Sequence, residues 1–235
     1  MELIPKRAAI KWIVLTIVIP LAVTMFASNF YFAIWYMKMA MAGTPHQGGP
    51  PLQIIQRAFI STASIGLWFT VGLWWFLRRK AESFSALFGT RTDSFTKDFL
   101  TGLILGVLWV IIYGLVGWPP FSTMFVVNAA KFKSLFTSLS AGFCEEFLFR
   151  GFVIAIIARA GGEKKAQLIW SSLAFGAAHL FWGPIGMLFT FVLGITFAAV
   201  TLRRGNVWAA VVAHSILNVC IEPGLIEKAM SFHGQ

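Results

Sequence analysis

The stretch Ile185–Leu202 reads IGMLFTFVLGITFAAVTL, eighteen positions without a charged side chain. A segment of this length predicts a transmembrane helix, because about 20 mostly apolar residues cross the hydrocarbon core of a bilayer. Six more apolar segments of comparable character follow or precede it. They are Trp12–Met37, Ala58–Leu77, Phe99–Trp118, Ser134–Arg159, Ala166–Trp182 and Asn206–Ile221. The sequence therefore predicts an all-α polytopic membrane bundle of about seven transmembrane helices.

The composition supports the same class of protein. Of the 235 residues, 58% are hydrophobic and only 12% are charged, whereas soluble domains carry about 25% charged residues. The aromatic share of 16% excludes a disordered chain, and two cysteines cannot form the disulfide framework of a secreted scaffold. We expect one integral membrane domain over residues 1–235, with a core that bears the motifs at residues 134–221.

The basic residues indicate topology rather than a nucleic-acid partner. The net charge is +10, but Lys and Arg stand in short clusters between apolar segments instead of forming a phosphate-binding face. With the N-terminus in the cytoplasm, the inside segments hold 13 Lys and Arg and the outside segments hold 5. We therefore expect a cytoplasmic N-terminus, an outside C-terminus, and membrane lipids as contacts. The last three spans are short for a full crossing.

Two glycines, Gly102 and Gly106, form a GxxxG pattern on the third predicted span. Small residues at this spacing let two helices approach closely in a membrane. We expect this approach to occur within the chain, ahead of dimerisation.

Strongly polar side chains inside the spans are few. Seven of the nine acidic residues, Asp98 among them, fall in loops or at span ends, while Glu145 and Glu146 stand in the middle of the fourth span. Arg150 lies in the same span, and His179 and His214 lie in the fifth and seventh. Each charge at a helix centre opposes insertion by about 2.5–3.5 kcal/mol. Such a concentration indicates a functional site, and we expect these side chains to meet in a polar cavity within the membrane bundle.

The spacing of these residues groups them by helix face. The pairs Glu146 and Arg150, Phe175 and His179, and His214 and Asn218 are each four residues apart, one helical turn. Two carboxylates, two imidazoles, an amide and a guanidinium suit acid–base chemistry, with a carboxylate as base and His and Asn as oxyanion donors. The same carboxylates and imidazoles could instead ligate a metal, although the chain lacks HExxH.

Three motifs now stand in order, each on its own apolar span: EEFLFR at 145–150 (EExxxR), FGAAH at 175–179 (FxxxH) and HSILN at 214–218 (HxxxN). Together they resemble the CPBP family, which comprises type II CAAX prenyl proteases, also described as glutamic intramembrane endopeptidases, and their bacterial abortive-infection-like relatives. The resemblance covers about residues 134–221. The first three spans carry no motif, and there it rests on topology alone.

The resemblance implies peptide-bond hydrolysis within a membrane that we expect to be bacterial and cytoplasmic. By position, Glu145 and His179 would activate the attacking water, and His214 and Asn218 would stabilise the oxyanion. Glu146, Arg150 and Phe175 would support the site. We favour a mechanism without a cofactor, the alternative being a zinc ion held by Glu145, Glu146, His179 and His214. His179 fits least well, because it lies only three residues from the end of its predicted span.

Other functions stay open at this point. A non-catalytic membrane immunity or scaffold protein and a proton-coupled transporter would also place Glu and His in helices, although no broken-helix repeat is visible. Arg150 could be a counter-ion of Glu146 or a direct substrate contact. We expect Cys144 and Cys220 to be inert, without a disulfide between them. The expected substrate is a membrane-associated peptide or protein; the resemblance does not choose among prenylated C-termini, peptide precursors and bacteriocins.

Overall fold

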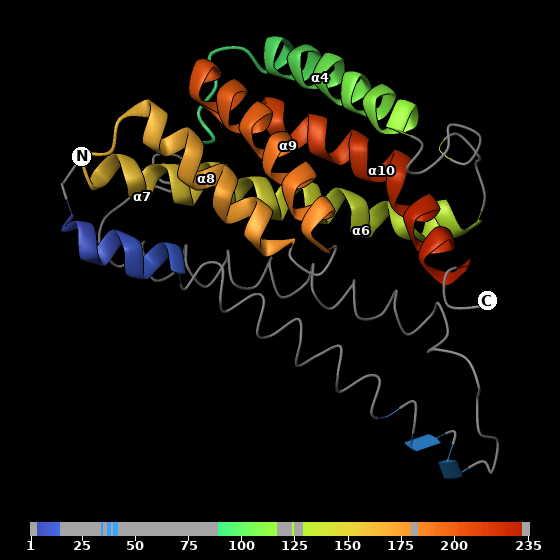
Figure 1. The fold of residues 1–235 in the computed structure, drawn as a ribbon. Helices are drawn as coiled ribbons and strands as arrows, with labels where there is room; N and C mark the ends of the chain where they lie inside the picture. Colours follow the sequence, from blue (N-terminus) through green and yellow to red (C-terminus); the bar gives the residue numbers. More distant parts are fainter. Residues whose placement is uncertain are drawn as a thin grey trace.

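The computed structural model describes residues 4–14, 34, 37, 38, 40, 41, 89–116, 124, 129–179 and 183–231. Every secondary-structure element in these ranges is helical (Figure 1). The labelled elements are α4 Phe95–Val116, α6 Ala129–Glu146, the π-helix η1 Phe147–Val153, α7 Ile154–Arg159, α8 Lys164–Ala178, α9 Gly183–Arg204 and α10 Trp208–Ser231. The prediction of an all-α chain is confirmed for the part that the structure describes.

Two helices of the described residues are long and apolar enough to cross a membrane. They are Phe95–Val116 and Pro184–Arg204, while Trp208–Ile221 is a shorter apolar stretch of α10. The first two correspond to the third and sixth predicted spans. The fourth predicted span is one helical rod made of α6, η1 and α7. The first span, apart from a helix at 6–14 and a few residues near its end, and the whole second span lie outside the described residues, so the count of seven stays a prediction.

Three predicted spans need corrected boundaries. Helix α8 ends at Ala178 instead of Trp182, because His179 leaves the helical conformation with φ −100° and ψ 19°. Helix α9 extends to both sides of its predicted span, and α10 continues ten residues beyond Ile221. At about 1.5 Å per residue, α9 is over 30 Å long, whereas α8 and the apolar stretch Trp208–Ile221 of α10 are short, as predicted. The prediction placed the end of α8 too late because Phe181 and Trp182 are as apolar as the helix before them.

Helix α10 is the centre of the arrangement. It packs against α4, α6 and α9, and α8 packs against α9 and η1 (Figure 1). The core of the described residues lies between these helices and includes Phe147, Phe152, Phe175 and Phe197, each at most 1% exposed. The motif-bearing helices thus surround one shared interior.

The α4–α10 contact depends on the two glycines of the GxxxG pattern. A Cβ at Gly102 would lie 2.5 Å from the backbone oxygen of Ala209, and one at Gly106 would lie 3.0 Å from that of Ala213. Because neither glycine has a side chain, the two helix backbones pack directly against each other. The prediction that the glycines serve packing within the chain is confirmed.

A valine at Gly102 is expected to lower the free energy of unfolding by about 1–3 kcal/mol, because its branches would have to push α4 away from α10. Thermal unfolding in detergent micelles measures the change. Ile104→Val is the matched control, since Ile104 is 63% exposed on the same helix and should change stability by less than about 0.5 kcal/mol. Equal stability of Gly102→Val and the control would contradict the close packing.

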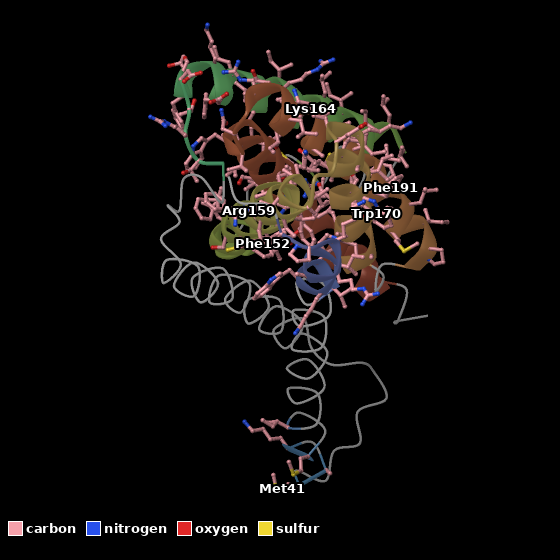
Figure 2. The ribbon with its side chains drawn as sticks, turned by 90° about the vertical axis from the view of Figure 1, so that its left-hand side faces the viewer. Met41, Phe152, Arg159, Lys164, Trp170 and Phe191 are labelled. Carbon is pink, nitrogen blue, oxygen red and sulfur yellow. The ribbon has the colours of Figure 1, made fainter. Side chains whose placement is uncertain are left out.

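The outer surfaces of α4, α8 and α9 are apolar. Ile104 and Leu115 of α4, Trp170 of α8 (Figure 2) and Leu188 of α9 are each at least 57% exposed. In a soluble protein, such continuous apolar surface is uncommon outside interaction sites. These helices therefore carry the apolar outward faces that a lipid environment requires.

Candidate active site

The two glutamates stand where an α-helix changes into a π-helix. Glu146 ends α6, and all seven residues of η1 are buried. Such π-helical turns are rare and occur frequently at functional sites. The neighbouring carboxylates have different surroundings: the Glu145 side chain is 31% exposed, whereas that of Glu146 is completely buried. The resemblance gave the two glutamates different roles, but the residue pattern did not predict their different exposure.

The buried carboxylate of Glu146 binds two cationic or hydrogen-donating groups. Its Oε1 lies 3.1 Å from Nη1 of Arg150 on the next helical turn. The same oxygen accepts a hydrogen bond from Nδ1 of His214 on α10 over 2.7 Å. Because a carboxylate can only accept, Nδ1 of His214 carries the hydrogen and Nε2 is left for other partners. Glu146 therefore fixes the orientation of the His214 ring.

Arg150 is a structural counter-ion in this arrangement. Its guanidinium lies 4.1 Å from the centroid of the Phe175 ring and donates from Nη2 to the backbone oxygen of Gly194 over 3.5 Å. The side chain is 1% exposed. Of the two roles that the sequence left open for Arg150, the structure favours the ion pair with Glu146 over contact with a substrate.

Phe175 lies between the polar groups of three helices. Besides Arg150, its ring contacts the rings of His179 at 4.6 Å and His214 at 5.7 Å between centroids. Gly194 of α9 makes room for it, since a Cβ there would lie 3.3 Å from the Phe175 ring. The ring thus separates the two imidazoles at a fixed distance while contacting both.

The second acid–imidazole pair is more open. Nε2 of His179 lies 3.7 Å from Oε2 of Glu145, and the His179 side chain is 20% exposed. The other ring nitrogen, Nδ1, donates to the backbone oxygen of Phe175 over 2.8 Å. In a neutral imidazole, Nε2 is therefore the acceptor. Because α8 ends at Ala178, His179 reaches Glu145 from a helix terminus, which resolves its apparent misfit within a span.

Helix α10 carries the last motif. His214 is buried at 4% exposure, and Asn218 is partly exposed one turn further along the same face. Helix α6 comes close to this part of α10 at Gly142, where a Cβ would lie 2.9 Å from the backbone nitrogen of Ser215. The missing side chain of Gly142 is what lets Glu146, one turn later, reach His214.

The four residues considered for zinc do not form a ligand set. In the described part of the chain, no three His, Cys, Asp or Glu side chains are grouped closely enough to hold a metal ion. Glu145 pairs with His179 and Glu146 pairs with His214, and the Arg150 cation lies against the second carboxylate. A divalent cation beside Glu146 would have to displace or oppose the guanidinium, and the absence of a metal from the reaction stays a prediction.

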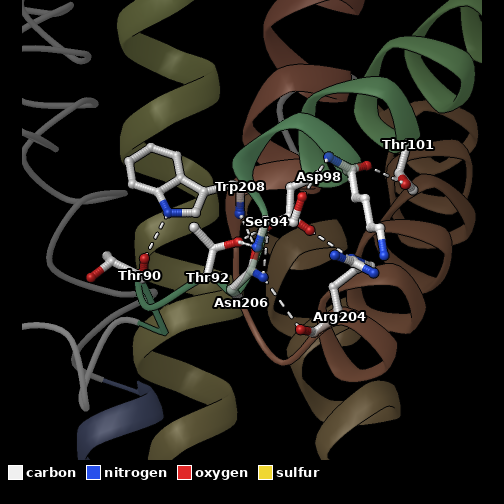
Figure 3. Close-up of polar contacts among 9 residues, drawn as sticks. Thr90, Thr92, Ser94, Asp98, Thr101, Arg204, Asn206 and Trp208 are labelled. Carbon is white, nitrogen blue, oxygen red and sulfur yellow. Dashed lines mark hydrogen bonds and ion pairs between the residues drawn. The ribbon is translucent and has the colours of Figure 1, made fainter.

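One buried acid was missed. The sequence assigned Asp98 to a loop, but it lies in the first turn of α4 with no exposed surface and pairs with Arg204 (Figure 3). An unpaired carboxylate beside an apolar span is energetically costly. This cost could have indicated from the sequence that Asp98 has a buried partner. Cys144 is a buried free thiol. That the two cysteines are inert stays a prediction.

Residues 128–220 match the family of type II CAAX prenyl endopeptidase Rce1-like proteins. The resemblance predicted from the three motifs is confirmed. The Rce1-like match contains every motif residue, from Glu145 to Asn218, and it excludes α4. The Rce1-like family consists of membrane-embedded proteases. No curated protein and no solved structure matched the chain.

Proposed function

We propose that the protein is an intramembrane endopeptidase that hydrolyses a peptide bond with water activated by Glu145 and His179. One observation carries the proposal: Oε2 of Glu145, a buried acceptor without a hydrogen-bond partner, lies 3.7 Å from Nε2 of His179, and both side chains are partly exposed. The distance is too long for a direct hydrogen bond, and a water that donates to both atoms accounts for it. The Rce1-like match supports the reaction class.

The hydrogen-bonding state of Glu145 and His179 suits a general base. The bond from Nδ1 of His179 to the oxygen of Phe175 leaves a lone pair on Nε2. A bridging water would donate one hydrogen to Glu145 and one to His179, so that its own lone pair remains for attack. As the water oxygen bonds to the substrate carbonyl carbon, its proton passes to the Glu145 carboxylate.

The oxyanion that forms needs hydrogen-bond donors, which we assign to His214 and Asn218. Nδ1 of His214 already donates to Glu146, so donation from Nε2 requires a proton on both ring nitrogens. The Glu146 carboxylate at 2.7 Å stabilises that imidazolium. In the last step the proton on Glu145 moves to the amine as the carbon–nitrogen bond breaks, and the carboxylate is restored.

We propose further that the reaction needs no metal, because the donor set pairs carboxylates with imidazoles and a guanidinium rather than converging on one point. The site would lie within a bundle of seven helices in one domain, with the N-terminus cytoplasmic and the C-terminus outside, in a bacterial cytoplasmic membrane. Lipids and a peptide or protein substrate would be its partners.

The test is cleavage by the full chain reconstituted in lipid vesicles. The probes are two quenched fluorescent peptides of one sequence that end in a CAAX box, one farnesylated on its cysteine and one not, with products identified by mass spectrometry. We expect cleavage of at least one peptide, unchanged by EDTA or 1,10-phenanthroline. The comparison of the two peptides reports whether a prenyl group is required.

His179→Ala serves as the inactive variant and Glu163→Gln as the control, since Glu163 is exposed before α8. Cleavage that persists in His179→Ala would overturn the assignment. Loss of cleavage with chelator, restored by zinc, would overturn the metal-free mechanism. Intact peptides together with proton uptake into the vesicles would favour the transporter, and neither activity would favour a scaffold.

A further inference from the structure

A fully buried carboxylate lies outside the site, at the start of α4. Asp98 has no exposed surface and accepts hydrogen bonds from three side chains (Figure 3). Nε of Arg204 donates to Oδ1 over 2.6 Å, Nδ2 of Asn206 donates to Oδ2 over 3.0 Å, and Oγ1 of Thr92 donates to Oδ2 as well. The donors come from the segment before α4, the end of α9 and the turn into α10. We call these four residues the Asp98 clamp.

The clamp holds the first turn of α10. Asn206 accepts a hydrogen bond from the backbone nitrogen of Trp208 over 3.1 Å, which satisfies one of the open donors of the helix start. The indole of Trp208 donates to the backbone oxygen of Thr90 over 2.7 Å, and the nitrogen of Val207 donates to that of Gly89 over 3.0 Å. Residues 89–92 are therefore attached to the beginning of α10 at several points (Figure 3).

Helix α4 packs against one face of α10. Its glycines contact Ala209, Val212, Ala213 and Ile216. At about 100° per residue, this face of α10 is opposite to the one with His214 and Asn218. The clamp fixes α10 at one end, and α4 holds its rear face along the next turns. Movement of α10 along or around its axis would thus break either the clamp or the glycine contacts.

We infer that Asp98 is a positioning residue for His214, acting through the start of α10. Trp208, where α10 begins, precedes His214 by six residues, or about 9 Å of helix. The 2.7 Å bond between His214 and Glu146 therefore depends on the register that the clamp sets. This assigns a role to α4, which carries no motif and lies outside the residues that match the family. The kinetic part of the inference rests on the proposed function, whereas the geometric part does not.

The test compares two pairs of neighbouring variants in the full chain. Asp98→Asn is compared with Asp93→Asn, and Arg204→Gln with Arg203→Gln, because Asp93 and Arg203 are exposed and lie close in sequence to Asp98 and Arg204. Cleavage of the CAAX peptide that proves to be a substrate is measured per folded enzyme at a temperature well below unfolding. Misplacement of a reacting group by about 1 Å costs about 100-fold. We expect kcat to fall by about tenfold to 100-fold in both clamp variants, with KM within about twofold.

A second readout separates positioning from simple loss of stability. The ¹⁵N signals of the His214 ring, assigned by their absence in His214→Asn, report its bond to Glu146. We expect Asp98→Asn to shift these signals and to leave those of His179 in place. Unchanged kcat and unchanged His214 signals in a less stable protein would overturn the inference, as would equal effects of Asp93→Asn.

Two further outcomes can be distinguished: a clamp variant that does not fold, and a wild-type protein that does not cleave. If Asp98→Asn does not fold, Arg204→Gln decides, because its side chain is 29% exposed and its loss is milder. If the wild-type protein cleaves neither peptide, the proposed function fails, and the His214 signals alone decide for or against the clamp.

Discussion

Replacing Glu145 by glutamine is expected to abolish measurable peptide cleavage while the protein stays folded. Glutamine keeps the size of the side chain and its ability to hold a water, but it cannot take a proton from it. Loss of a general base lowers kcat by about 10²–10⁴-fold. Because the Glu145 side chain is 31% exposed and outside the Arg150 ion pair, the free energy of unfolding should change by less than about 1 kcal/mol.

The combination with His179→Ala sharpens this expectation. Groups that act on one water do not contribute independently, so the double variant should be scarcely slower than Glu145→Gln alone. The measurement is kcat per folded enzyme in vesicles, with melting temperatures taken on the same preparations. A Glu145→Gln protein that cleaves at more than about a tenth of the wild-type rate would show that the base lies elsewhere.

The sequence predicted which residues share a helix face, and the structure shows why it could predict no more. A spacing of four residues places His214 and Asn218 together, whatever the surrounding fold. The partners across helices depend on packing. That Glu146 rather than Glu145 bonds to His214 follows from the π-helical turn and from the close approach at Gly142. Neither feature is visible as a pattern in the chain.

The end of α8 and the contacts of the Asp98 clamp could not be predicted from the sequence, for a related reason. Hydropathy could not end α8 before His179, because the residues that follow are equally apolar. Asp98 was assigned to a loop because its partners, Arg204 and Asn206, are more than 100 residues away in the chain. The local sequence shows that burying a charge would be costly. It does not show the contact that compensates for this cost, because the partners are distant in the chain.

Replacing Glu146 by glutamine is expected to have the opposite signature, a large loss of stability. Arg150 would remain in the core at 1% exposure without a counter-charge. Its cation–π contact with Phe175 and its long bond to Gly194 cannot replace a carboxylate at 3.1 Å. Removing one partner of a buried ion pair costs about 3–5 kcal/mol. We expect little folded Glu146→Gln protein after purification, and a strongly lowered melting temperature for what remains.

A second substitution distinguishes the two roles of Glu146. Methionine at position 150 removes the unpaired cation and fills a similar volume, and such apolar replacements of buried ion pairs are often neutral or stabilising. The Glu146→Gln/Arg150→Met protein should therefore regain a melting temperature close to that of the wild type. It should not regain cleavage, because the neutral amide cannot stabilise the His214 imidazolium as the carboxylate 2.7 Å from Nδ1 does. A stable double variant with full activity would restrict Glu146 to charge balance, and the oxyanion role of His214 would then have to be abandoned.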